Sequence, residues 1–155
     1  MKTEWSTYSL LDTNVLVYAL EPSDEFKHEI ANELFESLFS GEEKLAVSTQ
    51  ILAETLNVFT LAKMAKSEAS IEDIYVMISD IISVPEIPKL VVNAQTVLQA
   101  AKLHMQFSID FYDALIAATM KENGITTIYT EDKDFDKIAG ITAINPFERH
   151  KKIKV

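Results

Sequence analysis

The sequence predicts an α/β domain in which a central parallel sheet is covered by helices on both faces. Two observations lead to this prediction. Short apolar runs alternate with longer stretches of helical periodicity, and this alternation is typical of a parallel sheet with helical crossovers. The chain has 155 residues, of which 48% are hydrophobic, enough for one sizeable core but hardly for two. We therefore expect one domain over residues 1–148 and a basic tail over residues 149–155.

The first part of the chain predicts two strands separated by helices. The expected elements are, in order, a strand at 8–11, a helix at 15–20, a helix at 22–39 and a strand at 45–48. The polar residues Asp12, Thr13 and Asn14 end the first strand, and Gly41 ends the second helix. The first strand is therefore short and is followed directly by polar side chains.

The middle of the chain predicts two long helices that look like an insertion beside the sheet. They cover residues 49–66 and 71–82. Pro85 and Pro88 then break the helical pattern, and residues 90–92 are a candidate strand.

The last part of the chain returns to alternating helices and strands. The expected elements are helices at 93–107 and 108–123, a strand at 126–129, a polar turn at 130–136, a short helix up to Gly140 and a strand at 141–144. Gly124 stops the second of these helices, and Asn145-Pro146 closes the last strand.

Two acidic residues, Asp12 and Asp132, come just after predicted strands. In open α/β sheets, ligands bind outside the carboxyl ends of the strands, so both side chains belong at the ligand-binding edge. Each also has a plainer interpretation, because Asp12 can cap the helix that follows it and Asp132 can be a solvated turn residue.

Two further acids interrupt helices that are otherwise free of charge. Glu54 is the only charged residue within 50–62, and Asp113 is the only one within 111–120. A carboxylate on an apolar helix face is costly unless it is paired or bound to a cation. No Lys or Arg lies near Asp113 in sequence, so its partner is either a metal ion or a residue brought by the fold.

The remaining polar candidates lie next to these acids. Asp110 is one turn before Asp113, and its simplest role is to cap that helix, so we treat it as peripheral. In the turn after residues 126–129, alternation places Asp132 and Asp134 on one side and Glu131 on the other, and Thr130 offers a hydroxyl.

Ionised carboxylates gathered in one pocket repel each other strongly unless a cation lies among them. Oxygen ligands of this kind suit Mg²⁺ or Mn²⁺. Such a site can activate a bound water and neutralise charge on a phosphodiester, which predicts a metal-dependent nuclease. The chain has no cysteine nucleophile, and none of its three histidines lies in a metal-ligand pair.

Composition narrows the class of protein further. The absence of cysteine excludes disulfides and thiolate metal sites. A net charge of −10 argues against general coating of nucleic acid, but not against an enzyme that meets phosphate through cations. Polar residues interrupt the apolar N-terminal stretch, so we expect neither a signal peptide nor a membrane span. We therefore expect a cytoplasmic protein.

At these residues the sequence resembles the PIN-domain family. The resemblance covers nearly the whole chain in the order and spacing of the family. Its motifs are Leu11-Asp12-Thr13-Asn14, Glu54, the run Phe111 to Ala118, the run Tyr129 to Phe135, Gly140-Ile141 and Asn145-Pro146-Phe147.

The resemblance implies a Rossmann-like three-layer α/β/α sandwich and an endoribonuclease that uses Mg²⁺ or Mn²⁺ to cut RNA. The most similar subgroup is that of the VapC-type toxins of type II toxin–antitoxin pairs, which implies a homodimer and a small antitoxin partner. By motif match, the core acidic roles fall to Asp12, Glu54, Asp113 and Asp132, which would act in catalysis and bind metal. Asp134 takes an auxiliary acidic role at the metal, and Asn14 and Thr130 support the acids.

Self-association is also predicted from the residues. The segments 51–62 and 71–82 are apolar around much of their circumference and have more apolar surface than one sheet face can cover. We expect a two-fold homodimer that uses helices from the first two-thirds of the chain.

Several alternatives remain open at this point. A free-standing RNA-processing nuclease and a non-catalytic PIN-like interaction module would carry the same motifs. A haloacid dehalogenase-type phosphatase needs a second Asp where this chain has Asn14. A receiver domain needs paired acids near the first strand, which Glu54 and Asp113 within helices fit poorly.

Overall fold

The computed structural model describes residues 4–61 and 66–148. Its centre is a five-stranded sheet in the order β3-β2-β1-β4-β5, with every neighbouring pair parallel. The strands are β1 (Ser9–Leu11), β2 (Leu45–Ser48), β3 (Lys89–Leu90), β4 (Thr127–Tyr129) and β5 (Thr142–Ile144). The predicted α/β fold with a parallel sheet is confirmed.

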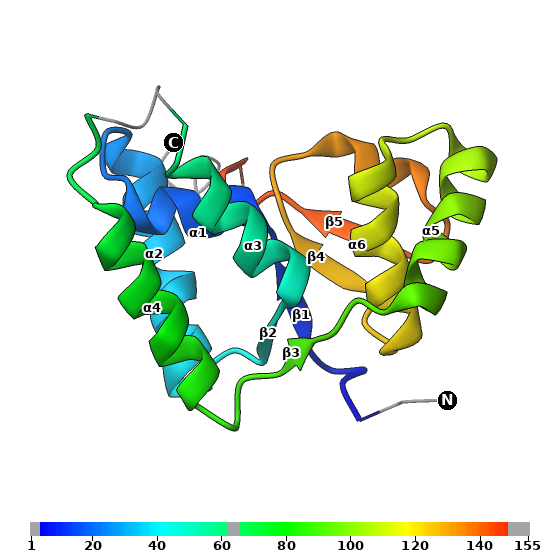
Figure 1. Cartoon of the computed structure of the whole chain (residues 1–155), viewed down its shortest axis with the longest axis horizontal. Helices are drawn as coiled ribbons and strands as arrows, with labels where there is room; N and C mark the ends of the chain where they lie inside the picture. Colours follow the sequence, from blue (N-terminus) through cyan, green and yellow to red (C-terminus); the bar gives the residue numbers. More distant parts are fainter. Residues whose placement is uncertain (1–3, 62–65, 149–155) are drawn as a thin grey trace.

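Helices cover both faces of this sheet. They are α1 (Thr13–Leu20), α2 (Glu25–Ser40), α3 (Thr49–Val58), α4 (Ile71–Ser83), α5 (Ala94–Phe107), α6 (Phe111–Glu122) and the short 3₁₀ helix η2 (Lys133–Lys137). In Figure 1, α1, α2 and α4 lie to one side of the strands, and α5 and α6 lie to the other. Contacts of α3 with α1 and α4 place it with the first group.

The strands β1 and β2 at the centre of the sheet are largely buried on both faces. Leu10 and Leu11 of β1 are fully buried, as are Ala46 and Val47 of β2. Strands covered on both sides are expected to read as continuous apolar runs, which is how both segments read. These residues form the centre of the hydrophobic core.

The chain reverses its direction across the sheet between β1 and β4. It first steps from β1 to β2 and β3, and then crosses back to pair β4 with β1, aligning Leu11 with Tyr129. This arrangement leaves a crevice at the carboxyl ends of the two central strands, which is the usual ligand position in open α/β sheets. The candidate site residues that follow β1 and β4 lie at this crevice.

The helix predicted over residues 49–66 is shorter than expected. The α3 helix ends at Val58, after which Phe59, Thr60 and Leu61 donate backbone hydrogen bonds to carbonyls three residues earlier. Such bonds tighten and end a helix. Buried Phe59 fixes this turn against the core, and residues 62–65 lie outside the described part of the chain.

Helices are predicted at 93–107 and 108–123, and the second of them begins later than expected. Ser108 has a positive φ of 54° and ends α5, and α6 begins only at Phe111. Asp110 caps α6, as predicted, through backbone N–H groups of Tyr112 and Asp113.

Small differences affect the remaining predicted elements. The strand expected at 90–92 is the two-residue β3, Lys89–Leu90. The predicted tail, residues 149–155, lies outside the described residues. None of the helices within residues 4–61 and 66–148 has the length and apolar character that crossing a membrane requires.

Candidate metal centre

Asp12 lies at the carboxyl end of β1 and caps α1. Its Oδ1 accepts a hydrogen bond of 2.8 Å from the backbone N–H of Thr13, and its Oδ2 accepts one of 2.7 Å from the Thr130 hydroxyl. Only 6% of the residue is exposed. Burial, the largest influence, raises the pKa of Asp12 to about 6, against the lowering effect of these hydrogen bonds.

Thr130 connects the ends of β1 and β4. Its Oγ1 donates to Asp12 and accepts hydrogen bonds from the Asn14 amide at 3.1 Å and from the backbone N–H of Asp132 at 3.0 Å. Asn14 also donates to Asp12 Oδ2 at 3.3 Å. The two residues to which the resemblance gives supporting roles therefore contact Asp12 directly.

Glu54 reaches the same edge from α3. Its Oε2 accepts a hydrogen bond of 3.0 Å from the Thr13 hydroxyl, and its Oε1 accepts one of 2.6 Å from the Gln50 amide. The same amide donates to the backbone carbonyl of Tyr112 at 3.0 Å. The Glu54 carboxylate is thus held by α1 and by its own helix, with a link to α6.

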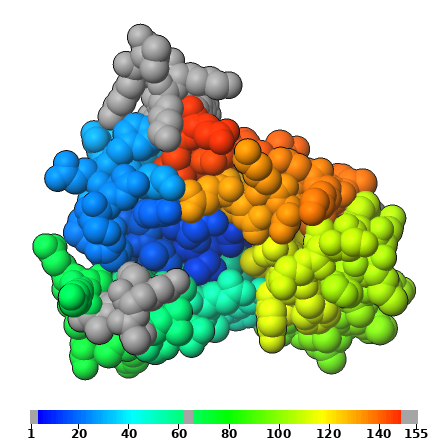
Figure 2. Space-filling view, turned by 90° about the horizontal axis from the view of Figure 1, so that it is seen from above, coloured from blue at the N-terminus to red at the C-terminus, as the bar shows by residue number. Residues whose placement is uncertain are grey.

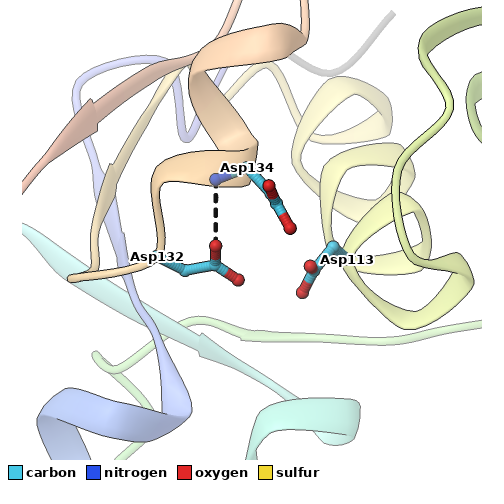
Figure 3. A group of neighbouring side chains, drawn as sticks. All are labelled: Asp113, Asp132 and Asp134. Carbon is cyan, nitrogen blue, oxygen red and sulfur yellow. Dashed lines mark hydrogen bonds between the residues drawn. The ribbon is translucent and has the colours of Figure 1, made fainter.

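Three aspartates converge from α6 and from the chain after β4. One carboxylate oxygen each from Asp113, Asp132 and Asp134 lies within 4.8 Å of the others. Figure 3 shows these side chains pointing toward one another from opposite sides of a small space. The Asp132 carboxylate also accepts a 2.9 Å hydrogen bond from the backbone N–H of Asp134, which fixes the turn.

These acids influence one another strongly. The pKa of Asp113 is raised to about 7, first by burial and then by the negative charges of Asp132, Asp110 and Asp12. Glu54 and Asp132 likewise act to raise the pKa of Asp12. Asp12, Glu54, Asp113 and Asp132 therefore belong to one electrostatic cluster, to which Asp110 contributes only from its exposed capping position.

The acids open onto a cleft of about 460 Å³. Asp12, Glu54 and Asp113 line one part of it, and Val17, Val58 and Ile116 provide apolar wall. Figure 2 looks onto this face, where dark blue, teal, yellow and orange segments distant in sequence meet. The site is thus assembled from α1, α3, α6 and the turn after β4.

The structure brings together every acid to which the sequence gave a core or auxiliary role. Asp134 belongs with Asp113 and Asp132 to the group of three whose carboxylate oxygens lie within 4.8 Å of one another. Sequence reasoning missed Thr13 and Gln50 as partners of Glu54. Thr13 stood within the Asp12-Thr13-Asn14 motif and could have been noticed, whereas no sequence signal indicated Gln50.

The donor set fits a hard divalent cation. The converging groups are carboxylate oxygens, with hydroxyl and amide groups behind them, and no nitrogen or sulfur ligand is among them. Carboxylate oxygens are the ligands that Mg²⁺ and Mn²⁺ favour. Burial and then neighbouring negative charge raise the pKa of Asp12 and of Asp113, and a bound cation would favour the ionised form of both.

The sequence matches the PIN domain family over residues 9–141, nearly the entire sheet and all of the acidic cluster. The chain belongs to the PIN domain family. Among curated proteins, none matches it significantly. Membership of the PIN family supports a nuclease.

Solved structures show the same PIN fold at low sequence identity. VapC20 from Mycobacterium tuberculosis, a toxin that cleaves the sarcin–ricin loop, is 20% identical, with 86% of this chain and 95% of that chain covered and a TM-score of 0.65. VapBC2 from Rickettsia felis, bound to a DNA fragment from its promoter, is 22% identical, with 89% and 98% covered and a TM-score of 0.60. A toxin–antitoxin complex from Klebsiella pneumoniae is 16% identical, with 89% and 97% covered and a TM-score of 0.56.

The raised pKa of Asp113 predicts how stability depends on pH. Its folded-state value of about 7 lies above the ordinary 3.8, so between these values the folded protein binds more protons than the unfolded chain. The free energy of unfolding of the metal-free protein should therefore fall as the pH rises through this window. Asp113→Asn should reduce that fall and stabilise the metal-free protein at about pH 8 by ~1 kcal/mol, a value discounted because the side chain is half-exposed and screened.

Urea denaturation with a chelator present, at about pH 5 and about pH 8, would measure this difference. Asp80→Asn, at an exposed position on α4, is the matched control and should leave the pH dependence unchanged. An Asp113→Asn variant with the wild-type pH dependence would contradict the assignment of the repulsion to this carboxyl.

Proposed function

We propose that the protein is a metal-dependent endoribonuclease that hydrolyses RNA phosphodiester bonds, with one nuclease domain over residues 1–148. The observation that carries the proposal is the convergence of Asp113, Asp132 and Asp134 beside Asp12 and Glu54 at the carboxyl ends of β1 and β4. An all-carboxylate cluster within a PIN domain is suited to phosphodiester hydrolysis.

In this proposal, Asp113, Asp132 and Asp134 hold Mg²⁺ or Mn²⁺ together with Asp12 and Glu54. A bound divalent cation supplies a more acidic water and positive charge for the phosphodiester. Thr130 orients the Asp12 carboxylate, and Thr13 and Gln50 orient that of Glu54. Because both carboxylates are held by hydrogen bonds, they need not reorganise when RNA enters the cleft.

The proposed physiological role is the toxin of a type II toxin–antitoxin pair acting on RNA in the cytoplasm. Its support is the similarity in fold to VapC20, a toxin that cleaves the sarcin–ricin loop, and to VapBC complexes. A free-standing RNA-processing nuclease and a non-catalytic interaction module are the alternatives that the experiments below separate.

Catalysis can be tested with a panel of charge-neutral variants. Asp12→Asn, Glu54→Gln, Asp113→Asn and Asp132→Asn should each lower cleavage of a fluorescent single-stranded RNA by more than about 100-fold, since even residues behind metal ligands commonly contribute about 10- to 100-fold. The wild-type rate should vanish with a chelator and return with Mg²⁺ or Mn²⁺.

The control for this panel is Asp110→Asn. Asn caps a helix about as well as Asp, so this variant should retain most activity although it lies one turn from Asp113. If Asp110→Asn abolished cleavage while Asp113→Asn did not, the acid on α6 would be wrongly assigned. If the wild type cut no RNA with either metal, the interaction-module alternative would replace the nuclease.

We also propose a small antitoxin that places an Arg or Lys among the acids. Such a side chain would pair with the carboxylates and displace the metal. The net charge of −10 would attract a basic partner, and this attraction should weaken with salt.

An inactive Asp12→Asn bait should copurify a small protein encoded beside this gene. That protein, once purified, should inhibit RNA cleavage by the wild type, and inhibition should weaken at high salt. Expression of the active enzyme alone should slow growth. Failure to recover such an inhibitor, together with normal growth, would favour the free-standing RNA-processing nuclease.

A homodimer through helices of the first two-thirds of the chain is the last part of this proposal. Its support is the apolar surface that α4 exposes at Tyr75, Val76 and Ile82. Sedimentation at micromolar concentration should give a dimer for the wild type and a monomer for Val76→Asp, which puts a charge on that surface. Val91→Asp is the matched control, because Val91 is similarly exposed (62% against 56%) but lies on no helix. A monomeric wild type would contradict the proposal.

A further inference from the structure

A second group of side chains lies beside the acidic cluster, and two of its members, Tyr18 and Glu131, line the same cleft. Glu131, which follows Thr130 and precedes Asp132, accepts a 2.8 Å hydrogen bond from the Lys27 ammonium on α2 and a 2.9 Å hydrogen bond from the Tyr18 hydroxyl on α1. Lys27 also donates to the Tyr18 hydroxyl at 3.1 Å. The three side chains close a ring of hydrogen bonds in which both Glu131 oxygens are engaged.

Two aromatic side chains lie beside the Lys27 ammonium. The Lys27 nitrogen lies 4.7 Å from the centre of the Tyr18 ring and 5.5 Å from that of Phe147, which is buried and follows β5. The two rings meet edge to face at 5.2 Å. We call these four residues, Tyr18, Lys27, Glu131 and Phe147, the Lys27 clamp.

The clamp has the features of an ion pair that contributes to structure. The side chains of Lys27 and Glu131 are only 25% and 29% exposed, and the pair is part of a network. Isolated exposed pairs contribute little, whereas pairs of good geometry within a network contribute more. The hydrogen bond to Glu131, the largest influence, raises the pKa of Lys27, so the ammonium remains charged.

The position of Glu131 makes this ion pair relevant to the metal centre. Thr130 is tied to Asp12 on one side of it, and Asp132 follows on the other, facing Asp113. The negative charges of Asp113 and Asp132 repel each other, and this repulsion acts to move the turn away from α6. The hydrogen bonds of Glu131 to Tyr18 on α1 and Lys27 on α2 form a second anchor that resists this movement.

We propose that the Lys27 clamp is a positioning device, which holds the turn of residues 130–134 so that Asp132 and Asp134 stay within metal-binding distance of Asp113. Among the described residues, no hydrogen bond or ion pair joins Lys27 to the proposed metal ligands, and Lys27 acts through Glu131. The inference rests on the proposed metal-dependent function, because it assigns the clamp a role in metal affinity.

The test compares Mn²⁺ affinity and amide hydrogen exchange in full-length variants. Lys27→Met should weaken Mn²⁺ binding about tenfold, the lower end of the loss expected when residues supporting metal ligands are changed. Binding is followed by electron paramagnetic resonance of the free ion. In the metal-free protein, the amides of residues 130–134 should exchange faster than in the wild type, because the turn has lost one of its two anchors.

The matched control is Lys102→Met, which removes the same charge from an exposed position on α5 and should leave both measurements unchanged. Lys27→Arg should restore most of the affinity. A double variant, Lys27→Met with Glu131→Gln, should bind Mn²⁺ about as weakly as Lys27→Met alone, since the two residues act as a pair. If Lys27→Met does not fold, Tyr18→Phe retains the aromatic ring and the Lys27–Glu131 ion pair but removes the two hydrogen bonds of the hydroxyl, and should shift both measurements in the same direction to a smaller extent.

Wild-type Mn²⁺ affinity in Lys27→Met, or an equal loss in Lys102→Met, would overturn the proposal. Unchanged amide exchange in residues 130–134 would overturn it as well. If the wild type itself bound no Mn²⁺, the proposed function would fail, and faster exchange in Lys27→Met would still support the clamp as an anchor of the turn.

Discussion

Mutual repulsion among clustered carboxylates is the constraint on which the arrangement of this protein depends. Asp12, Glu54, Asp113, Asp132 and Asp134 come from four separate segments, and burial and neighbouring charge raise the pKa of both Asp12 and Asp113. Like charges do not attract one another, so in the absence of a cation the scaffold must hold these carboxylates close together. Hydrogen bonds hold two of these acids in place. Thr130 and Asn14 donate to Asp12, and Thr13 and Gln50 donate to Glu54.

The fold supplies the remaining rigidity through its buried sheet. β1 and β4 pair in register at the centre, so the residues after Leu11 and after Tyr129 leave the sheet side by side. Core strands are among the last elements to open in local unfolding, which makes the carboxyl ends of β1 and β4 a stable base for charged groups. α3 and α6 then bring Glu54 and Asp113 to the same edge from the two opposite sides of the sheet.

The parts of this arrangement that depend on local pattern could be predicted from the sequence. Strand ends, the Asp110 cap and the isolated charge of Asp113 all follow from residues within one or two turns. The parts that depend on distant contacts could not. The Glu131–Lys27 pair spans 104 residues, and neither residue is distinguishable by pattern from the other surface charges. The early end of α3 was missed for a similar reason, because burial of Phe59 against the core outweighs the helical periodicity beyond it.

The two sides of the turn after β4 show how one short segment serves opposing requirements. Asp132 and Asp134 lie near Asp113 of α6, and Glu131, which precedes them in sequence, contacts the Lys27 cation on α2. Repulsion between Asp113 and Asp132 acts to move the turn away from α6, and the Lys27 clamp resists this movement because it ties Glu131 to α1 and α2. The contact of Thr130 with Asp12 and Asn14 is the other anchor, since it ties the start of the turn to the end of β1. The position of the turn therefore depends on these opposing interactions. A cation among the aspartates would draw the turn toward α6, because it would replace repulsion with attraction.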